Sequence, residues 1–122
     1  MKKAVWFLPF WLAGVLVVQS QSPNVTFRWN DEAERADYMA IERETDDVKK
    51  AAGAERFLVE HKNADPRAKL EVYRMLIVSY ANRGDWVKAR MNCDRIMAVT
   101  TKPSDDEKAK CAQIGSRARE NQ

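Results

Sequence analysis

The chain has 122 residues, which is enough for one domain, and its 32% charged and 45% hydrophobic residues are ordinary for a helical protein. The formal net charge is +3, but Lys2 and Lys3 lie in a segment that we expect to be removed, which leaves 19 basic against 18 acidic residues. A net charge of +1 excludes the strong long-range field that marks a nucleic-acid partner.

The first 20 residues have the layout of a secretory signal peptide. Lys2 and Lys3 give a short basic start, residues 4–18 are apolar apart from one proline and one glycine, and we expect a cut after Ser20. The alternative is an uncleaved membrane anchor, but about 15 apolar residues fall short of the ~20 that span a bilayer. No cysteine lies near the cut, which excludes a lipoprotein anchor.

Residues 21–30 show no helical period, and we predict a flexible segment whose Phe27 and Trp29 fold back on the first helix. That helix is predicted over 32–44, capped by Asp31, with Glu34 as the reciprocal partner of a capping box. Tyr38 and Ile41 are expected beside its packing face rather than on it. The expected packing face is thin and consists of Ala33, Ala36 or Asp37, Met39 or Ala40, and Arg43.

Thr45-Asp46-Asp47 predicts that the helix stops and restarts, because these side chains compete for backbone hydrogen bonds and favour caps. A second helix is predicted over 48–61. The sequence leaves open whether the two helices are separate or form one long bent rod. The apolar residues of the second helix recur at helical spacing and are Val48, Ala51, Ala52, Ala54, Phe57, Leu58 and Val59.

Asp65 and Pro66 predict the start of a third helix, with aspartate as the cap and proline at the first helical position. Apolar steps of three and four then predict two amphipathic helices within 73–96, joined by a very short turn. Gly84 can take the positive φ that ends the first of them, and Asp85 can cap the second. So short a turn makes the two helices antiparallel neighbours.

This spacing resembles the tetratricopeptide repeat, and residues 57–85 are also similar to exported bacterial envelope proteins that carry such repeats. The resemblance implies an all-α fold: a right-handed array of antiparallel helix pairs, about two repeats followed by a C-terminal capping helix. The first two helices would form a degenerate first repeat. The residues that carry the pattern are Tyr73, Leu76, Ile77, Tyr80, Gly84, Trp86, Ala89, Cys93 and Ile96, with departures from the family preference at Ile77, Cys93 and Ile96.

Pro103 breaks the fourth helix, and Ser104 with Glu107 predicts a capping box that opens a last helix to about Glu120. Its thin apolar face, surrounded by charged residues, is typical of a terminal capping helix. We expect this face to consist of Ala109, Ala112, Ile114 and Ala118.

Cys93 and Cys111 are the only two cysteines of the chain. A disulfide between them would close a loop of about 18 residues and stabilise the fold by roughly 3 kcal/mol. The alternative is a pair of buried free thiols, since spacing alone does not establish the geometry.

The residues do not indicate catalysis, a metal site or a cofactor. His61 is the only histidine, falls at a helix end, and lacks the further histidines or cysteine pair that a zinc site would need. The acidic pairs stand where helices begin, and neither a nucleophile elbow nor a glycine-rich phosphate loop occurs.

We therefore predict a signal peptide over 1–20, a flexible segment over 21–30 and a helical domain over 31–122 that binds a protein or peptide in the periplasm or outside the cell. One alternative is a structural homodimer that pairs through the flank of Tyr38 and Ile41. Another is an envelope accessory protein anchored to the membrane by residues 4–18. The resemblance implies a peptide groove on the first helix of each pair, with the candidate residues Glu71, Arg74, Val78, Ala81 and Asn82.

Overall fold

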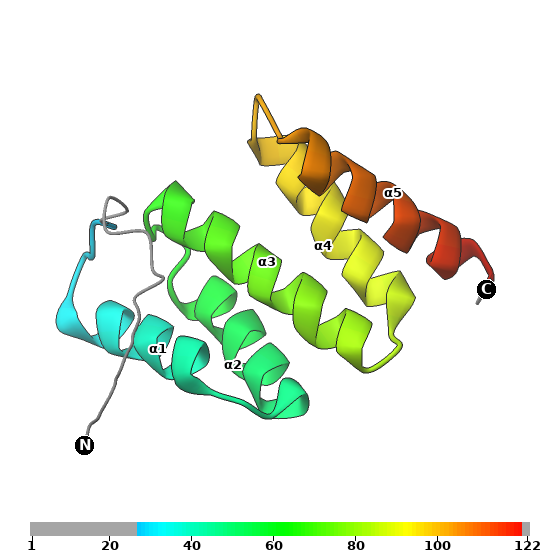
Figure 1. Cartoon of the computed structure of the whole chain (residues 1–122). Coiled ribbons are helices and arrows are strands. Elements are labelled where there is room, and N and C mark those ends of the chain that lie inside the picture. The colour runs from blue at the N-terminus through cyan, green and yellow to red at the C-terminus, as the bar shows by residue number, and fades with distance from the viewer. Residues whose placement is uncertain (1–26, 121–122) are drawn as a thin grey trace, which may run out of the picture.

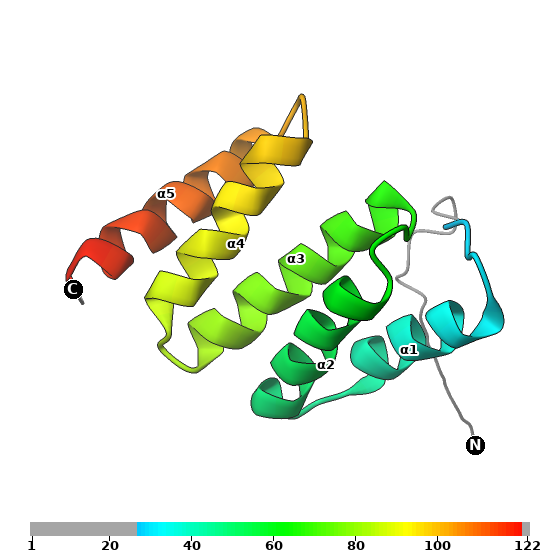
Figure 2. The ribbon, with the colours of Figure 1, turned by 180° about the vertical axis from the view of Figure 1, so that it is seen from behind.

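Five α-helices and no strands make up residues 27–120, the part of the chain that the computed structural model describes. The helices are α1 (Glu32–Arg43), α2 (Asp47–Glu60), α3 (Pro66–Asn82), α4 (Trp86–Val99) and α5 (Asp105–Glu120). They lie side by side in chain order, and each packs mainly against its neighbours in the sequence (Figure 1 and Figure 2). The predicted all-α class is confirmed, and the first two helices are separate rather than one bent rod.

The helices begin where the sequence places a capping side chain. The carboxylates of Asp31, Asp46, Asp65 and Asp85 each accept a hydrogen bond from a backbone N–H in the first turn of the helix that follows. Ser104 does the same for α5, because its hydroxyl accepts from the N–H of Glu107 at 3.1 Å. These caps satisfy donors that have no partner within the helix, so the predicted capping positions are confirmed. α2 begins at Asp47, one residue before the predicted start.

The turn between α3 and α4 depends on a single glycine. Gly84 has a φ of 76°, a conformation that side-chain-bearing residues rarely adopt, and its N–H donates to the carbonyl of Ala81 at 3.0 Å. The chain reverses within three residues, which brings α3 and α4 into antiparallel contact (Figure 1). Ala89 is fully buried, as expected for a small residue where two helices approach closely.

The predicted packing residues of this helix pair are only partly correct. Leu76, Ala89 and Ile96 are fully buried and Tyr80 is 5% exposed, but Tyr73 and Trp86 are only half-buried. Val72 takes the fully buried position that was expected for its neighbour Tyr73. The buried apolar residues along the five helices are Tyr38, Ile41, Ala51, Ala54, Phe57, Ala68, Val72, Leu76, Tyr80, Ala89, Cys93, Ile96, Ile114 and Ala118.

The side of α1 that was predicted to pack against the core is not the buried side. Tyr38 and Ile41 are 2% and 4% exposed and form the buried side of the helix, because Phe27 and Trp29 fold back against Tyr38 with ring centroids at 5.4 and 5.2 Å. Phe57 of α2 closes the same aromatic cluster from the other side, at 6.1 Å from Tyr38. Of the residues expected to pack, Met39 is half-buried against the core. The others are exposed: Ala33, Ala36, Asp37, Ala40 and Arg43.

This arrangement removes the surface on which the homodimer alternative depended. Tyr38 and Ile41 are covered by their own chain, so they offer no apolar flank to a second copy. The return of Phe27 and Trp29 to the first helix is confirmed, which makes the end of the 21–30 segment part of the folded domain.

The capping box at α1 also differs from the prediction. Glu34 is buried, and its carboxylate accepts from the backbone N–H of Asn30 at 3.0 Å and from the Asn30 side chain at 3.1 Å. Its expected partner was the N–H of Asp31. The contact therefore extends one residue further back and anchors the segment that carries Phe27 and Trp29.

The buried side of α5 is formed by a stripe at steps of four, three and four residues. Glu107 and Cys111 are half-buried, Ile114 is 8% exposed and Ala118 is fully buried. The alanines predicted to share this face, Ala109 and Ala112, are exposed. The stripe follows Cys111 because that residue is bonded to α4, which fixes the side that α5 turns inward.

The predicted signal peptide of residues 1–20 lies outside the described residues. Among residues 27–120, no helix combines the length and the apolar character that crossing a bilayer would need. The choice between a cleaved leader and a membrane anchor therefore stays a prediction from the sequence.

Asp65 is expected to make the stability of the fold depend on pH. Its carboxylate accepts from the Arg67 guanidinium at 2.7 Å and from the backbone N–H groups of Arg28 and Arg67 at 2.9 and 3.0 Å, contacts that hold its pKa well below its usual range. A group whose pKa falls on folding stabilises the protein above its unfolded pKa, near 3.8 here, and this contribution is lost as the pH falls through the lower folded value.

Asp65→Asn keeps a capping side chain but cannot titrate. We expect it to flatten part of the fall in unfolding free energy between about pH 5 and about pH 2, measured by urea denaturation at several pH values. Asp94→Asn, at an exposed position of α4, is the control and should leave the fall unchanged. An equal acid dependence for the Asp65→Asn variant and the unmodified protein would contradict the prediction.

Candidate functional site

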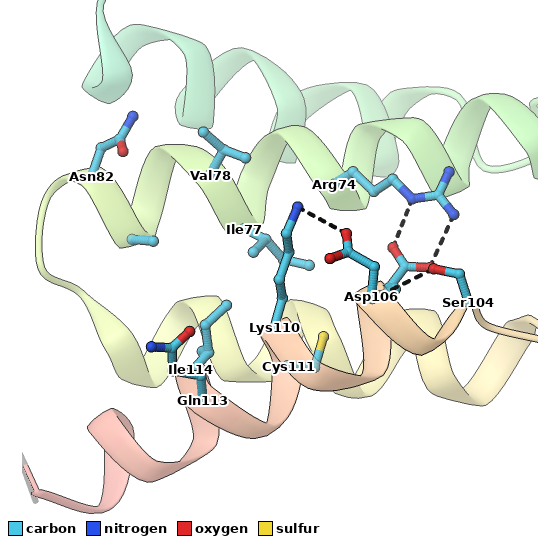
Figure 3. Close-up of a pocket in the computed structure, with 12 residues that line it drawn as sticks. Arg74, Ile77, Val78, Asn82, Ser104, Asp106, Lys110, Cys111, Gln113 and Ile114 are labelled. Atoms are coloured by element: carbon cyan, nitrogen blue, oxygen red, sulfur yellow. Dashed lines mark hydrogen bonds and ion pairs between the residues drawn. The ribbon is translucent and has the colours of Figure 1, made fainter.

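An open groove with a cavity volume of about 620 Å³ lies between α3 and α5. Figure 3 shows residues of both helices lining it from opposite sides. The α3 side contributes Arg74, Ile77, Val78, Ala81 and Asn82, and the α5 side contributes Ser104, Asp106, Glu107, Lys110, Cys111, Gln113 and Ile114. Two segments that are separated by all of α4 in sequence thus form the two walls.

Four of the five candidate groove residues lie together in this groove: Arg74, Val78, Ala81 and Asn82. Glu71, the fifth, lines a neighbouring cavity of about 530 Å³ between α3 and the α1–α2 connection. Arg74 and Val78 line both cavities, so the exposed side of α3 forms the boundary between them. The exposed face of α3 therefore lines both cavities.

The α5 wall was not foreseen from the sequence. The repeat register predicts the exposed residues of α3 alone and does not indicate which helix lies opposite them. Cys111 is the one sequence signal that could have located α5, because its bond to Cys93 holds the helix against α4. In this position α5 faces α3 across the groove.

An ion pair joins the two walls at one end of the groove. Arg74 donates from Nε and Nη2 to the two carboxylate oxygens of Glu107, at 2.8 and 3.1 Å (Figure 3). Arg74 also contacts Glu71. The Arg74 guanidinium holds the pKa of Glu107 below its usual value, and this carboxylate raises the pKa of Arg74. Both groups therefore remain charged and paired at neutral pH.

The other charges at the groove are paired as well. The Nζ of Lys110 lies 3.2 Å from the Oδ2 of Asp106, one turn earlier on α5, and both side chains are exposed. With Arg74 bonded to Glu107, each cation at the groove has a carboxylate partner within the protein. An incoming ligand thus meets no uncompensated charge of either sign.

What remains accessible between the ion pairs is apolar and amide surface. Val78 is 57% exposed, Ile77 and Ala81 are half-buried, and Ile114 approaches them from α5. Asn82 and Gln113 stand near the other end of the groove and offer amide donors and acceptors (Figure 3). This combination fits a short peptide segment, whose apolar side chains can be buried while its backbone bonds to amides.

A disulfide between Cys93 and Cys111 ties the α5 wall to α4, with Cα atoms 5.7 Å apart. Of the two arrangements that the sequence left open, the structure has the bonded one. Besides the crosslink, α5 is held by a buried side made of Ile114, Gly115 and Ala118 and by the pair between Arg74 and Glu107. The Arg117 guanidinium also lies over the Trp86 ring of α4, at 5.0 Å from the ring centroid. The crosslink is therefore central to keeping the groove assembled.

His61 ends α2 and bonds back to α1. Its Nε2 lies 2.8 Å from an oxygen of Asp37, its Nδ1 lies 3.8 Å from the buried carboxylate of Glu34, and its ring packs on Phe57 at 4.8 Å. Donor atoms of Asp37, Glu60 and His61 lie within 4.8 Å of one another and are the group among residues 27–120 that could hold a divalent cation. The contacts to Asp37 and Phe57 give the histidine a structural role without an ion.

We found no match between this chain and protein-family models, curated proteins or solved structures. The properties of the groove are therefore the basis on which a function is inferred. These properties are apolar and amide surface, internally paired charges, and a wall held by a disulfide.

Proposed function

We propose that this chain is an exported protein-interaction module of the tetratricopeptide type, which binds a peptide segment of a partner in the groove between α3 and α5. The observation that carries the proposal is the exposed Val78 side chain, set between Ile77, Ala81 and Ile114 in a groove whose charges are already paired. An exposed apolar residue inside a concave site gains free energy when a ligand covers it.

The proposed ligand is a short, uncharged, amphipathic segment in extended conformation. One or two apolar side chains would cover Val78 and Ile114, and backbone groups would bond to Asn82 and Gln113. A strongly charged segment is disfavoured, because it would have to break the pair between Arg74 and Glu107 or the pair between Lys110 and Asp106.

Location in the bacterial periplasm or outside the cell is part of the proposal. It is supported by the basic and apolar pattern of residues 1–20 and by a disulfide, a bond that persists in oxidising compartments. Binding without catalysis is supported by a groove whose carboxylates are engaged in ion pairs.

The proposal is tested by selecting peptides of about ten residues from a displayed random library on the purified protein. Selected peptides should bind Val78→Asp at least about tenfold more weakly than the unmodified protein, because burial of a valine side chain is worth about 1.5–3 kcal/mol. Val48→Asp is the matched control, since Val48 and Val78 are 58% and 57% exposed and Val48 lies outside the groove.

Binding to the Val48→Asp variant should equal binding to the unmodified protein. Two results would reject the groove as the site: failure of the selection to enrich any peptide, and equal loss of binding in the two variants.

A further inference from the structure

The two cysteines of the disulfide differ in their access to the groove. Cys111 is half-buried and lines the groove (Figure 3). Cys93 is 2% exposed, lies on α4 and is not among the residues that line the groove. A reagent that enters between α3 and α5 therefore reaches Cys111 rather than the buried Cys93.

Access decides which sulfur of a disulfide a thiolate attacks. Attack on Cys111 expels the sulfur of Cys93 and leaves the incoming group attached to Cys111 inside the groove. Attack on Cys93 would have to pass through packed core, because Cys93 belongs to the buried cluster formed with Leu76, Tyr80 and Ala89.

We propose that the groove is a thiol–disulfide exchange site, in which a thiol-bearing ligand forms a mixed disulfide with Cys111. The thiolate of the ligand bonds to the Cys111 sulfur, the bond between Cys111 and Cys93 breaks, and Cys93 leaves as a thiolate that takes a proton from water. The ligand sulfur is oxidised to the disulfide level and Cys93 is reduced, so no further oxidant or reductant is needed. Cys93 can later attack Cys111 and release the ligand thiol.

The exchange also controls the groove that receives the ligand. Once Cys93 and Cys111 are no longer joined, non-covalent contacts alone hold α5. They are the small buried surface of Ile114, Gly115 and Ala118, the pair between Arg74 and Glu107, and the Arg117 guanidinium over the Trp86 ring. Arg74 and Glu107 are 38% and 17% exposed in their side chains, so solvent weakens that pair. The α5 wall thus loosens whenever a thiol occupies Cys111.

The thiol can be a small molecule or a cysteine of a bound peptide, and the chemistry at Cys111 is the same for both. We use glutathione as the first probe and a short cysteine-containing apolar peptide as the second. The native, oxidised protein is incubated with each probe, the reaction is quenched with acid, free thiols are alkylated, and the two cysteines are mapped by mass spectrometry.

We expect the probe on Cys111 and the alkyl group on Cys93. Protein unfolded in guanidinium should carry the probe on both cysteines, which shows the reactivity without the groove. A probe found mainly on Cys93 in the native protein, or no exchange in the native protein under conditions where the unfolded one reacts, would overturn the proposal.

Blocking the entrance gives a second, independent readout. Val78→Trp should slow the exchange with glutathione, whereas Val48→Trp, at an equally exposed position outside the groove, should not. Equal rates in the two variants would mean that the thiol does not arrive through the groove.

Loosening of α5 is measured by hydrogen exchange of backbone amides. Backbone amides of residues 105–120 should exchange about 100-fold faster after Cys111 has been modified, while those of α2 stay unchanged. Unchanged exchange in α5 would reject the control of the groove by the disulfide.

This inference rests on the proposed function for the delivery of a peptide thiol, but the glutathione experiments do not depend on peptide binding. A protein that exchanges at Cys111 and selects no peptide would reject the proposed function alone. A protein that selects peptides and shows no preference for Cys111 would reject the exchange site alone.

Discussion

Replacing Phe57 with alanine is expected to lower the free energy of unfolding by about 3–5 kcal/mol. Phe57 is 1% exposed, so the substitution removes a fully buried ring and leaves a cavity between α1 and α2. The ring also packs on the rings of Tyr38 and His61, with centroid distances of 6.1 and 4.8 Å, and these contacts would be lost with it. A domain of this size is stable by only about 5–15 kcal/mol, so the variant should be close to unfolding.

The measurement is urea denaturation followed by circular dichroism, with the unmodified protein as reference. Val59→Ala is the control, because Val59 lies two residues further along the same helix and is 67% exposed. It should change the unfolding free energy by no more than about 0.5 kcal/mol. Phe57→Leu retains part of the volume and should fall between the two. Equal denaturation midpoints for Phe57→Ala and Val59→Ala would show that the aromatic cluster does not hold α1 to α2.

The helix boundaries could be predicted from the sequence because they depend on local chemistry. Asp31, Asp65 and Asp85 cap helices through bonds to amides two or three residues away, and Gly84 turns the chain by its own φ. Such signals involve neighbouring residues only, so they can be read without knowing the rest of the fold.

The inward face of a helix is harder to predict, because it depends on partners far away in the sequence. α1 turns Tyr38 inward to meet Phe57 and the returning Phe27. Tyr38 and Ile41 stand three residues apart, which is the one signal within α1 that marks this face. The buried polar residues follow from the face that turns inward, and once buried they are satisfied by partners three or four residues away. Glu34 is buried because Asn30 satisfies it, and Asn92 because it bonds to Lys88 and Arg95.

The candidate site shows the same division. The α3 wall could be selected from the spacing of Arg74, Val78 and Asn82 on one helix face. The α5 wall depends on a capping box that formed only by half: Ser104 caps the helix, but the Glu107 carboxylate, expected to bond back to the cap, reaches Arg74 instead. A side chain with two available partners cannot be assigned from sequence when one partner belongs to another helix.

Removing the disulfide in the double variant Cys93→Ala, Cys111→Ala is expected to cost about 3 kcal/mol, because the bond closes a loop with a sequence separation of 18. The loss should be concentrated in α5. The apolar side chains that α5 fully buries or nearly buries are Ile114 and Ala118, and ordering its 16 residues opposes this gain. The half-buried pair of Arg74 with Glu107 and the contact of Arg117 with the Trp86 ring each add about 1 kcal/mol.

The expected result is a lower urea midpoint, with helical signal lost first from α5 while α1 to α4 remain folded. Alanine is used rather than serine because Cys93 is 2% exposed and a hydroxyl there would lack a partner. Reduction of the unmodified protein is the control, since it breaks the bond without changing either side chain volume, and it should give nearly the same midpoint as the double variant. A midpoint shift worth less than about 1 kcal/mol in both samples would mean that α5 docks without its crosslink, and the groove would then persist in its absence.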